Sequence, residues 1–357
     1  MTPSSSACSA VTLVGGAGFI GHHLALALAN AGHRVSIVDS LMINNLYAIH
    51  AGGFVHERYR PFLEMRRRLL AERGIDTIVA DACDYHQLSR ILAALAPRII
   101  VHLAAVAHID RANKDPWSTF RHTLQTLENA IDIAAALKIE QFVFLSSSTV
   151  YGDFTAPVMD ETMHCNPKGI YGALKLSAEM ILREYGRLKS VPYTIIRPMA
   201  AYGARCVSGR VIQQFIEAAL DHRPLQLRGD IGERIDFTHV ADIVAGIQAA
   251  LGNERAMGEI FNITAGHSRS LHELVQLIGQ EVPGLTVERQ ARDDQRPLRG
   301  TLSVAKAERL LNYRPRWQLA EGVADYVGWY RSINWGVPDD DARQAQAAEG
   351  KAEARHV

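Results

Sequence analysis

A tyrosine and a lysine stand four residues apart in the segment Tyr171-Gly-Ala-Leu-Lys175, within a pattern that predicts a helix over 171–189. Residues at this spacing share one helical face, so the Lys175 ammonium can lower the pKa of the Tyr171 phenol and make it a base near neutral pH. Ser147 follows the apolar segment 141–146 and is expected to hydrogen-bond the same substrate oxygen. We therefore expect proton transfer at a substrate hydroxyl, although this spacing alone is common by chance.

Three glycines, Gly15, Gly18 and Gly21, follow an apolar segment and open a helical pattern. The first permits a tight turn, the second lets the backbone approach a pyrophosphate, and the third packs helix against strand. The helix start then offers free N–H groups and a positive dipole end to phosphates. This context predicts a dinucleotide site, and a purely structural glycine turn is the alternative.

The second apolar segment ends at Asp39, about 20 residues after Gly21. A carboxylate at this place can accept hydrogen bonds from both hydroxyls of a ribose. It would repel a 2′-phosphate, so the sequence predicts NAD rather than NADP.

These residues need elements that position them, and β-rich apolar segments alternate with helical patterns along the chain. The alternation predicts a parallel sheet with helices on both faces, and the almost wholly apolar strands are typical of strands buried on both sides. We expect an α/β fold, a Rossmann-type doubly wound parallel sheet with a smaller interleaved C-terminal α/β substrate lobe. The expected strands are 10–15, 34–39, 76–80, 98–103, 141–146, 193–197 and 258–263, and the expected helices are 19–31, 85–96, 117–137, 171–189, 208–221, 240–252 and 270–280.

The alternation weakens after about residue 200, where turn residues increase. We expect a flexible N-terminus over 1–9 and a mainly NAD-binding domain over 10–200. A mainly substrate-binding lobe over 201–336 is expected to interleave with that domain. The polar, Ala-rich segment 337–357 is short of core residues and is expected to be a tail.

The composition excludes several classes of function. The chain has 357 residues, and its 38 Lys and Arg equal its 38 Asp and Glu, so no overall basic field predicts a nucleic-acid or membrane partner. The four cysteines form no CxxC pair, which predicts no metal site and fits a reducing compartment. No apolar run reaches the roughly 18 residues of a membrane span. We therefore expect a cytoplasmic protein.

Together these motifs resemble the extended short-chain dehydrogenase/reductase family, specifically its NAD-dependent nucleotide-sugar epimerases and dehydratases. The resemblance covers roughly 10–332 and rests on VGGAGFIG, VADACD, HLAA, SSSTVYG, YGALK, RPMAAYG and RIDFTHVAD, in this order. It implies a tightly held NAD, a nucleoside diphosphate sugar between the lobes, and Asp81 near the adenine. It also implies that Lys175 binds the nicotinamide ribose. The expected cofactor residues are Gly15, Gly18, Phe19, Ile20, Gly21, Asp39, Asp81, Ala82, Leu103, Ala104, Ala105, Tyr171 and Lys175.

The resemblance also bears on the reaction. Members of the family begin alike, because the tyrosine takes a proton from a sugar hydroxyl while hydride passes to NAD and a keto-sugar forms. Dehydratases then need a further acid and base, usually including an acidic residue just before the VYG element, to remove the C5 proton and expel the C6 hydroxyl. Ser148 and Thr149 stand there instead, and neither titrates usefully.

The motif SSSTVYG looks more like that of the UDP-sugar 4-epimerases, in which the 4-keto sugar turns and accepts hydride on its other face. Ser147, Tyr171 and Lys175 are the expected catalytic residues, with Thr149 assisting proton traffic. Two alternatives stay open: a dehydratase or reductase using the same triad, and a catalytically silent NAD-binding scaffold or sensor.

The sequence also departs from the family pattern. Ala200 replaces an asparagine that commonly follows the Arg-Pro-hydrophobe element, and the usual Arg-Asp-aromatic has become Arg234-Ile-Asp-Phe. A shift of one residue reverses the face of a strand, which weakens Arg234 as a phosphate ligand. His122 sits about where an asparagine often occurs, and its role is open. The substrate-binding candidates are Ser148, Arg205, Arg210, Arg234 and Arg292, and each arginine has the alternative of being a solvated surface charge.

Two loops lack an assigned role. Segment 41–74 is longer than the usual link and contains Arg66-Arg67-Arg68; we expect an inserted helix with a solvated basic face, or alternatively a lid or subunit contact over the cofactor. Segment 105–116 holds His108, Arg111 and Asn113, which would select the sugar or lie in a surface loop. The resemblance further implies a homodimer, paired through the helices at 117–137 and 171–189.

Overall fold

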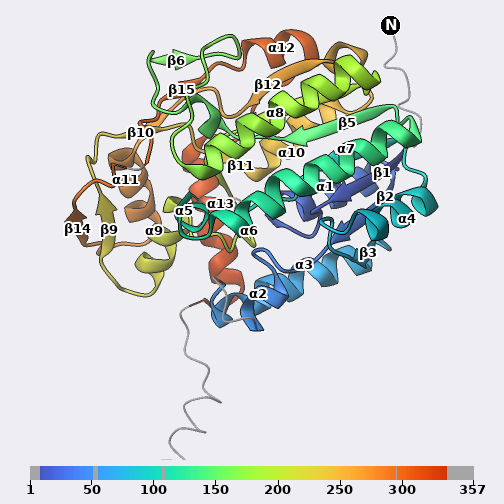
Figure 1. Ribbon diagram of the computed structural model, residues 1–357. Helices are drawn as coiled ribbons and strands as arrows, with labels where there is room; N and C mark the ends of the chain where they lie inside the picture. The colour runs from blue at the N-terminus through green and yellow to red at the C-terminus, as the bar shows by residue number, and fades with distance from the viewer. Residues whose placement is uncertain (1–8, 51–54, 107–108, 295, 336–357) are drawn as a thin grey trace, which may run out of the picture.

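A parallel sheet forms the centre of the computed structural model, which describes residues 9–50, 55–106, 109–294 and 296–335 (Figure 1). Its seven strands run in the order β12-β7-β5-β4-β1-β2-β3. The order reverses between β1 and β4, which makes a topological switch point at their carboxyl ends. All seven expected strands are present, so the predicted fold class is confirmed. They are β1 (Ala10–Val14), β2 (Arg34–Asp39), β3 (Asp76–Val79), β4 (Ile99–His102), β5 (Gln141–Leu145), β7 (Tyr193–Pro198) and β12 (Glu259–Ile263).

Helices cover both faces of this sheet because successive strand residues point to opposite sides. Leu13 of β1 belongs to the core under α1 (Phe19–Asn30) and α10 (Val240–Ala250). Its neighbour Val14 belongs to the core on the other face, under α4, α7 and α8. Helices α7 and α8 lie side by side against the sheet (Figure 1). Their bounds are α4 (Tyr85–Leu95), α7 (Thr126–Leu137) and α8 (Ile170–Lys189).

A second core forms the C-terminal lobe around three helices, α9 (Val211–Leu220), α11 (Leu271–Glu281) and α13 (Leu319–Ser332). The two cores interleave along the chain, since β12 lies in the main sheet and α10 packs in the core of that sheet, although both follow residue 201. Phe62 and Leu63 of the 41–74 insertion pack into this second core. The insertion therefore bridges the sheet to the C-terminal lobe.

Several elements differ from the expected ones. The helix expected over 117–137 is divided into α6 (Pro116–Phe120), a π-helical turn η2 (Arg121–Gln125) and α7. The sequence did not reveal the short strand pairs, which bury too few apolar residues to show a period. The remaining elements are α2 (Leu46–His50), η1 (Glu57–Tyr59), α3 (Arg60–Glu72), α5 (Ile109–Lys114), η3 (Ser148–Tyr151), β6 (Val158–Met159), β8 (Ala201–Tyr202), β9 (Leu225–Arg228), β10 (Arg234–Ile235), β11 (Thr238–His239), η4 (Glu254–Ala256), β13 (Arg269–Ser270), β14 (Val287–Gln290), β15 (Thr301–Leu302) and α12 (Ala305–Leu311).

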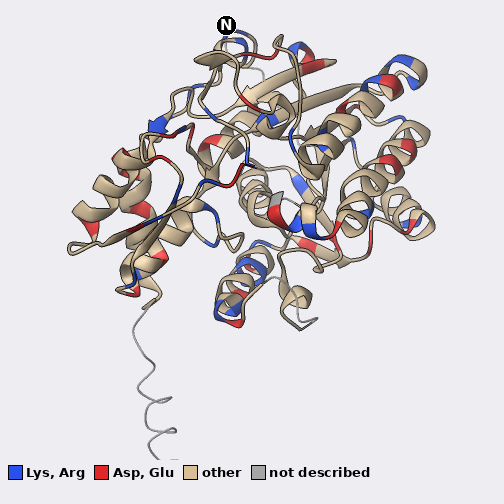
Figure 2. Cartoon of the chain, turned by 60° about the vertical axis from the view of Figure 1, so that its left-hand side comes forward, with Lys and Arg blue, Asp and Glu red and all other residues tan. Residues whose placement is uncertain are grey.

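Basic and acidic residues are interspersed over the elements (Figure 2). Within the described ranges, no helix is both long and apolar enough to cross a membrane. Residues 1–8 of the N-terminus expected to be flexible (1–9) lie outside the described residues, as do the expected polar tail 337–357 and His108.

Candidate active site

A cavity opens at the carboxyl ends of β1, β2 and β4, beside the switch point of the sheet. Eleven of the thirteen expected cofactor residues line it; Tyr171 and Lys175 are not among its lining residues. Sequence reasoning missed other residues of the cavity wall, because their side chains belong to none of the motifs. The expected residues that line the cavity are Gly15, Gly18, Phe19, Ile20, Gly21, Asp39, Asp81, Ala82, Leu103, Ala104 and Ala105, and the missed ones include Ser40, Ile43, Asn44, Arg66, His122, Thr126, Val207 and Ser208.

The glycine-rich turn has no room for side chains. Gly15 has a φ of +79°, and a Cβ there would lie 2.5 Å from the backbone nitrogen of Ala104. A Cβ at Gly21 would lie 2.5 Å from the carbonyl oxygen of Gly16. Helix α1 begins just after Gly18 without a side-chain cap, so its first N–H groups face the turn unsatisfied. The turn is therefore shaped for an anionic group such as a phosphate.

Asp39 ends β2 at the wall of the same cavity. Its carboxylate accepts hydrogen bonds from the backbone N–H groups of Ala17, at 2.9 Å, and Leu41, at 2.8 Å. Burial raises the pKa of Asp39, and these two hydrogen bonds act against that rise. The amides hold the carboxylate in place beside the glycine turn, where a ribose attached to the phosphate would lie.

Tyr171 and Ser147 meet at the carboxyl end of β5. Tyr171 stands at the start of α8 and is 8% exposed, and Ser147 caps η3 directly after the strand. Burial raises the pKa of the Tyr171 phenol, while the charge of Arg210, a hydrogen bond with the Ser147 side chain and the charge of Arg299 lower it. The phenol therefore sits in a buried site in which neighbouring polar and charged groups favour its ionised form.

Lys175 lies one turn along α8 and is 2% exposed. Its ammonium donates a hydrogen bond to the carbonyl oxygen of Leu145 at 2.6 Å and lies 4.6 Å from the centre of the Phe144 ring. Burial lowers the pKa of Lys175 to about 7, against the charge of Glu179. The cations that the structure shows acting on Tyr171 are thus arginines, whereas the expected action of Lys175 stays a prediction.

Two hydroxyl residues follow Ser147 on η3. Ser148, 2% exposed, accepts a hydrogen bond from Nη1 of Arg299 at 3.0 Å. The hydroxyl of Thr149 is buried and has no hydrogen-bond partner in the described part of the chain. Arg299 was missed from the sequence, although it belongs to the segment QARDDQRPLRG from which Arg292 was selected.

The four arginines selected from the sequence are placed differently. Arg210 lines the cavity and acts on Tyr171. Arg205 instead donates from Nε to Nε2 of His22 on α1, at 2.9 Å. Arg234 donates to the carbonyl oxygen of Ser268 at 2.5 Å and does not line the cavity. Arg292 donates to the carbonyl oxygen of Arg296 at 2.8 Å and pairs with Glu233 and Asp294.

The basic run of the insertion is not uniformly solvated. Arg67 and Arg68 are exposed, but Arg66 is 1% exposed and lines the cavity. Arg66 donates from Nε and Nη2 to the carbonyl oxygen of Arg205 at 3.1 and 2.5 Å, and within the described ranges no carboxylate pairs with it. Burial lowers the pKa of Arg66 to about 10. The expectation of a solvated basic face was therefore wrong for Arg66, because α3 turns this side chain inward.

In the segment 105–116, which we expected to select the sugar, two side chains make contacts within the protein. The side-chain oxygen of Asn113 accepts a hydrogen bond from the backbone N–H of Ile170 at 3.2 Å, at the start of α8. The guanidinium of Arg111 reaches the side chain of Asn44 at 3.5 Å. Asn113 therefore helps to position the helix that carries Tyr171.

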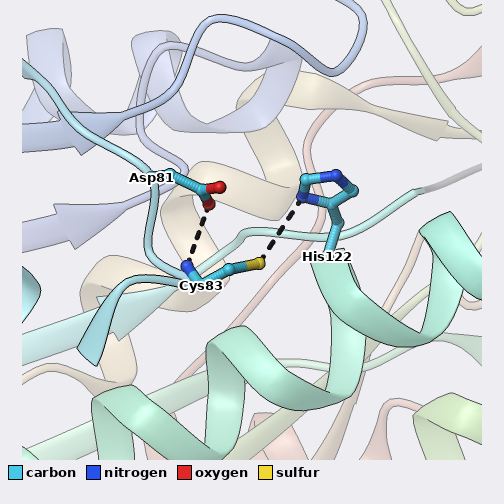
Figure 3. Close-up of side chains that lie close together, drawn as sticks. All are labelled: Asp81, Cys83 and His122. Atoms are coloured by element: carbon cyan, nitrogen blue, oxygen red, sulfur yellow. Dashed lines mark hydrogen bonds between the residues drawn. The ribbon is translucent and has the colours of Figure 1, made fainter.

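Asp81, Cys83 and His122 lie close together (Figure 3). The carboxylate of Asp81 accepts from the backbone N–H of Cys83 at 2.9 Å, and Sγ of Cys83 lies 3.8 Å from Nδ1 of His122. Burial raises the pKa of the Cys83 thiol to about 12, which favours the protonated thiol in this group. We assign no metal to this group. Asp81 and His122 both line the cofactor cavity.

Comparisons with known proteins agree with this geometry. A model described as the NAD dependent epimerase/dehydratase family matches residues 11–264. A Bacillus subtilis protein described as an uncharacterized UDP-glucose epimerase is 27% identical over 330 residues, which cover 91% of this chain and 99% of the relative. A bovine (Bos taurus) dTDP-D-glucose 4,6-dehydratase is 24% identical over 342 residues, covering 93% and 92% of the two chains.

Solved structures also share the fold. The UDP-glucuronic acid 4-epimerase from Bacillus cereus, in complex with UDP-glucuronic acid and NAD, superposes with a TM-score of 0.80 at 24% identity, over 90% of this chain and 99% of that one. The dTDP-glucose 4,6-dehydratase DesIV from Streptomyces venezuelae, with NAD bound, gives a TM-score of 0.78 at 26% identity over 92% and 99%. Fold similarity therefore includes both epimerases and dehydratases, so the side chains at the site must separate the two reactions.

Proposed function

Because the chain belongs to the NAD dependent epimerase/dehydratase family, we propose that it is an NAD-dependent nucleotide-sugar epimerase acting at C4 through a transient 4-keto intermediate. One observation carries the choice of reaction. The groups beside the Tyr171 phenol are a hydroxyl and two guanidiniums, and Ser148 and Thr149 follow where a dehydratase would need acids. Epimerisation needs one group that both accepts and returns a proton, and Tyr171 supplies it.

The cavity fits NAD. The glycine turn and the uncapped start of α1 would hold the pyrophosphate, and Asp39 would accept from the ribose hydroxyls. A carboxylate there would disfavour a 2′-phosphate, which would favour NAD over NADP. NAD, when bound, supplies the hydride acceptor and donor for the reaction.

The protein's own residues would move and hold the proton. Tyr171, as phenolate, would take the proton of the sugar hydroxyl, and the charges of Arg210 and Arg299 would stabilise that phenolate. Ser147 would hydrogen-bond the reacting oxygen and keep it near the phenol. Tyr171 would then return the proton after the keto-sugar has presented its other face. The role of Lys175 at the nicotinamide ribose stays a prediction.

The mass of the product tests this reaction. Incubation with UDP-hexoses and UDP-uronic acids should give an epimer of unchanged mass, whereas a dehydratase product would be lighter by one water. Tyr171→Phe should lower kcat by at least about 100-fold. Tyr85→Phe, which removes an exposed hydroxyl bonded to Asp132, serves as the matched control and should retain activity. Loss of water, or no turnover with any nucleotide sugar by an NAD-loaded enzyme, would contradict the assignment.

We also propose that the protein forms a homodimer through α7 and α8. Large apolar side chains stand exposed at these helices and the adjoining α6, among them Trp117 at 70%, Met180 at 59% and Leu188 at 64%. Exposed apolar side chains that gather in this way are typical of an interaction surface. The cytoplasmic location stays a prediction from the sequence.

A further inference from the structure

A guanidinium from the C-terminal lobe enters the catalytic site next to the proposed base. Arg299 precedes β15, is partly buried, and donates to the hydroxyl of Ser148, the residue after Ser147. Burial lowers the pKa of Arg299 to about 10, so the group is still charged near neutral pH. In the part of the chain that the structure describes, no carboxylate lies within ion-pair distance of it. Arg299 is thus a charged group that lacks a charged partner.

The acids nearest to Arg299 are engaged with other groups. Glu233 lies 3.9 Å from Arg292, and Asp153 accepts from the backbone N–H of Leu298 at 2.7 Å and pairs with Lys168 at 3.4 Å. Arg210 adds a second positive charge beside the same phenol. Glu233 and Asp153 therefore act on Arg299 only from beyond ion-pair distance, and no carboxylate of the described residues pairs directly with this cation beside Tyr171.

The buried hydroxyl of Thr149 is also without a partner among the described residues. It lies on η3 with Ser148, so an unpaired donor stands next to the Ser148–Arg299 pair. A buried polar group without a partner is costly, which indicates that a ligand completes this site. The arrangement of one guanidinium and two hydroxyls suits a planar anion that accepts several hydrogen bonds.

The chemistry of a nucleotide sugar limits which anion can reach this place. The diphosphate is attached at C1, across the ring from C4, whereas the substituent on C5 is the neighbour of C4. In a hexose this substituent is a neutral hydroxymethyl group, which cannot pair with a guanidinium. In a uronic acid it is a carboxylate, which can.

From this arrangement we infer that the substrate is a nucleoside diphosphate uronic acid whose carboxylate is bound by Arg299 together with the hydroxyls of Ser148 and Thr149. The inference rests on the proposed function, since it places the reacting C4 hydroxyl at Tyr171. It goes further by naming the class of sugar and the residues that select it.

Matched substrates test the inference, because UDP-glucuronic acid and UDP-glucose differ only in the C6 group. The wild-type enzyme should show a kcat/KM for the uronic acid at least about 100-fold above that for the hexose. Because the charge of Arg299 also favours the phenolate of Tyr171, Arg299→Gln should lower both values. The ratio of the value for the uronic acid to that for the hexose should nevertheless fall about 100-fold, and Arg299→Lys should restore part of that ratio. Arg269→Gln, which removes an exposed arginine paired with Glu273, should change neither value.

Binding measurements separate a sugar carboxylate from a phosphate. In calorimetry on NAD-loaded protein, Arg299→Gln should weaken UDP-glucuronic acid and leave UDP itself within about 2-fold. Equal weakening of UDP would show that Arg299 binds the diphosphate and would overturn the inference. Preferred conversion of the neutral hexose would also overturn it while leaving the epimerase assignment intact, whereas failure to convert either sugar would count against the epimerase assignment itself.

Discussion

At the scale of single residues, the site is defined by cations placed where burial makes their charge effective. Arg66, Arg210 and Arg299 come from distant segments and reach the cavity or the phenol beside it. Inside a protein such charges act more strongly than in water, because less solvent screens them. Two predictions belong to this scale.

The first concerns Arg66 on the insertion. Arg66→Gln should weaken NAD binding about 10-fold, because it removes a buried cation from the cavity wall opposite the carboxylate of Asp39. Arg67→Gln removes the neighbouring exposed charge and is the matched control. Calorimetric titration of each apoenzyme variant with NAD measures both affinities. Equal affinities for the two variants would mean that Arg66 acts only in packing α3.

The second concerns the pH dependence of Tyr171. The positive charge of Arg210 favours the phenolate and so lowers the pKa of Tyr171. Arg210→Gln removes that effect, so the pKa should rise and the acid limb of the kcat/KM profile should move to higher pH. Activity near pH 7 should fall, and part of it should return in alkaline buffer. An unchanged profile with a uniformly lower rate would instead indicate a role in substrate binding alone.

At the scale of elements, each part of the site depends on how a strand ends. The carboxyl ends of β1, β2, β4 and β5 lie at one edge of the sheet because the strands are parallel. Asp39 is the last residue of β2, and the glycines and Ser147 lie in the turns that follow β1 and β5. Tyr171 lies in the first turn of helix α8, which brings it to this edge. The π-helical turn η2 lies before α7 and carries His122 to the cavity.

One prediction tests the turn after β1. Gly15→Ala should abolish NAD binding and lower the free energy of unfolding by about 2–4 kcal/mol, because the φ of +79° is strained for alanine and the new Cβ would meet the backbone of Ala104. Gly74→Ala shares a positive φ of +63° but meets no atom within 4 Å, so it should cost only about 1 kcal/mol. Chemical denaturation of both variants measures the difference, and similar costs would show that the contact with Ala104 does not matter.

At the scale of the whole molecule, two cores share one chain, and large apolar side chains are exposed at α6 and α8. The main sheet binds the cofactor, the C-terminal lobe supplies Arg210 and Arg299, and the insertion connects the two through Phe62 and Arg66. The active site therefore requires both cores to fold together, because neither core alone contains all of its residues.

The exposed face of α6, α7 and α8 gives the prediction at this scale. Trp117→Glu combined with Met180→Glu should convert a dimer into a monomer, because each charge would be buried in the interface. Val287→Glu, at an exposed apolar position on β14, is the control and should remain dimeric. Size-exclusion chromatography with light scattering measures the mass. A monomeric wild-type protein would refute the proposed dimer.

The sequence by itself determined the features that are local in the chain. The strand-turn-helix spacing of Gly15, Gly18 and Gly21, the carboxylate after β2 and the apolar periods predicted the sheet and the walls of the cavity, because each depends on neighbours within one or two elements. Ser147 and Tyr171 could be paired from the sequence for a similar reason, since both follow from where a strand ends and a helix begins.

Only the tertiary structure decided which charged side chains reach the site. Arg66, Arg205 and Arg234 look alike in the sequence, yet the first faces the cofactor cavity, the second holds His22, and the third bonds to Ser268. Arg299 carried no signal of its own, and its contact with Ser148 joins residues 151 positions apart. The partners of long, flexible cationic side chains depend on which distant segments pack near them. No local sequence pattern predicts that packing.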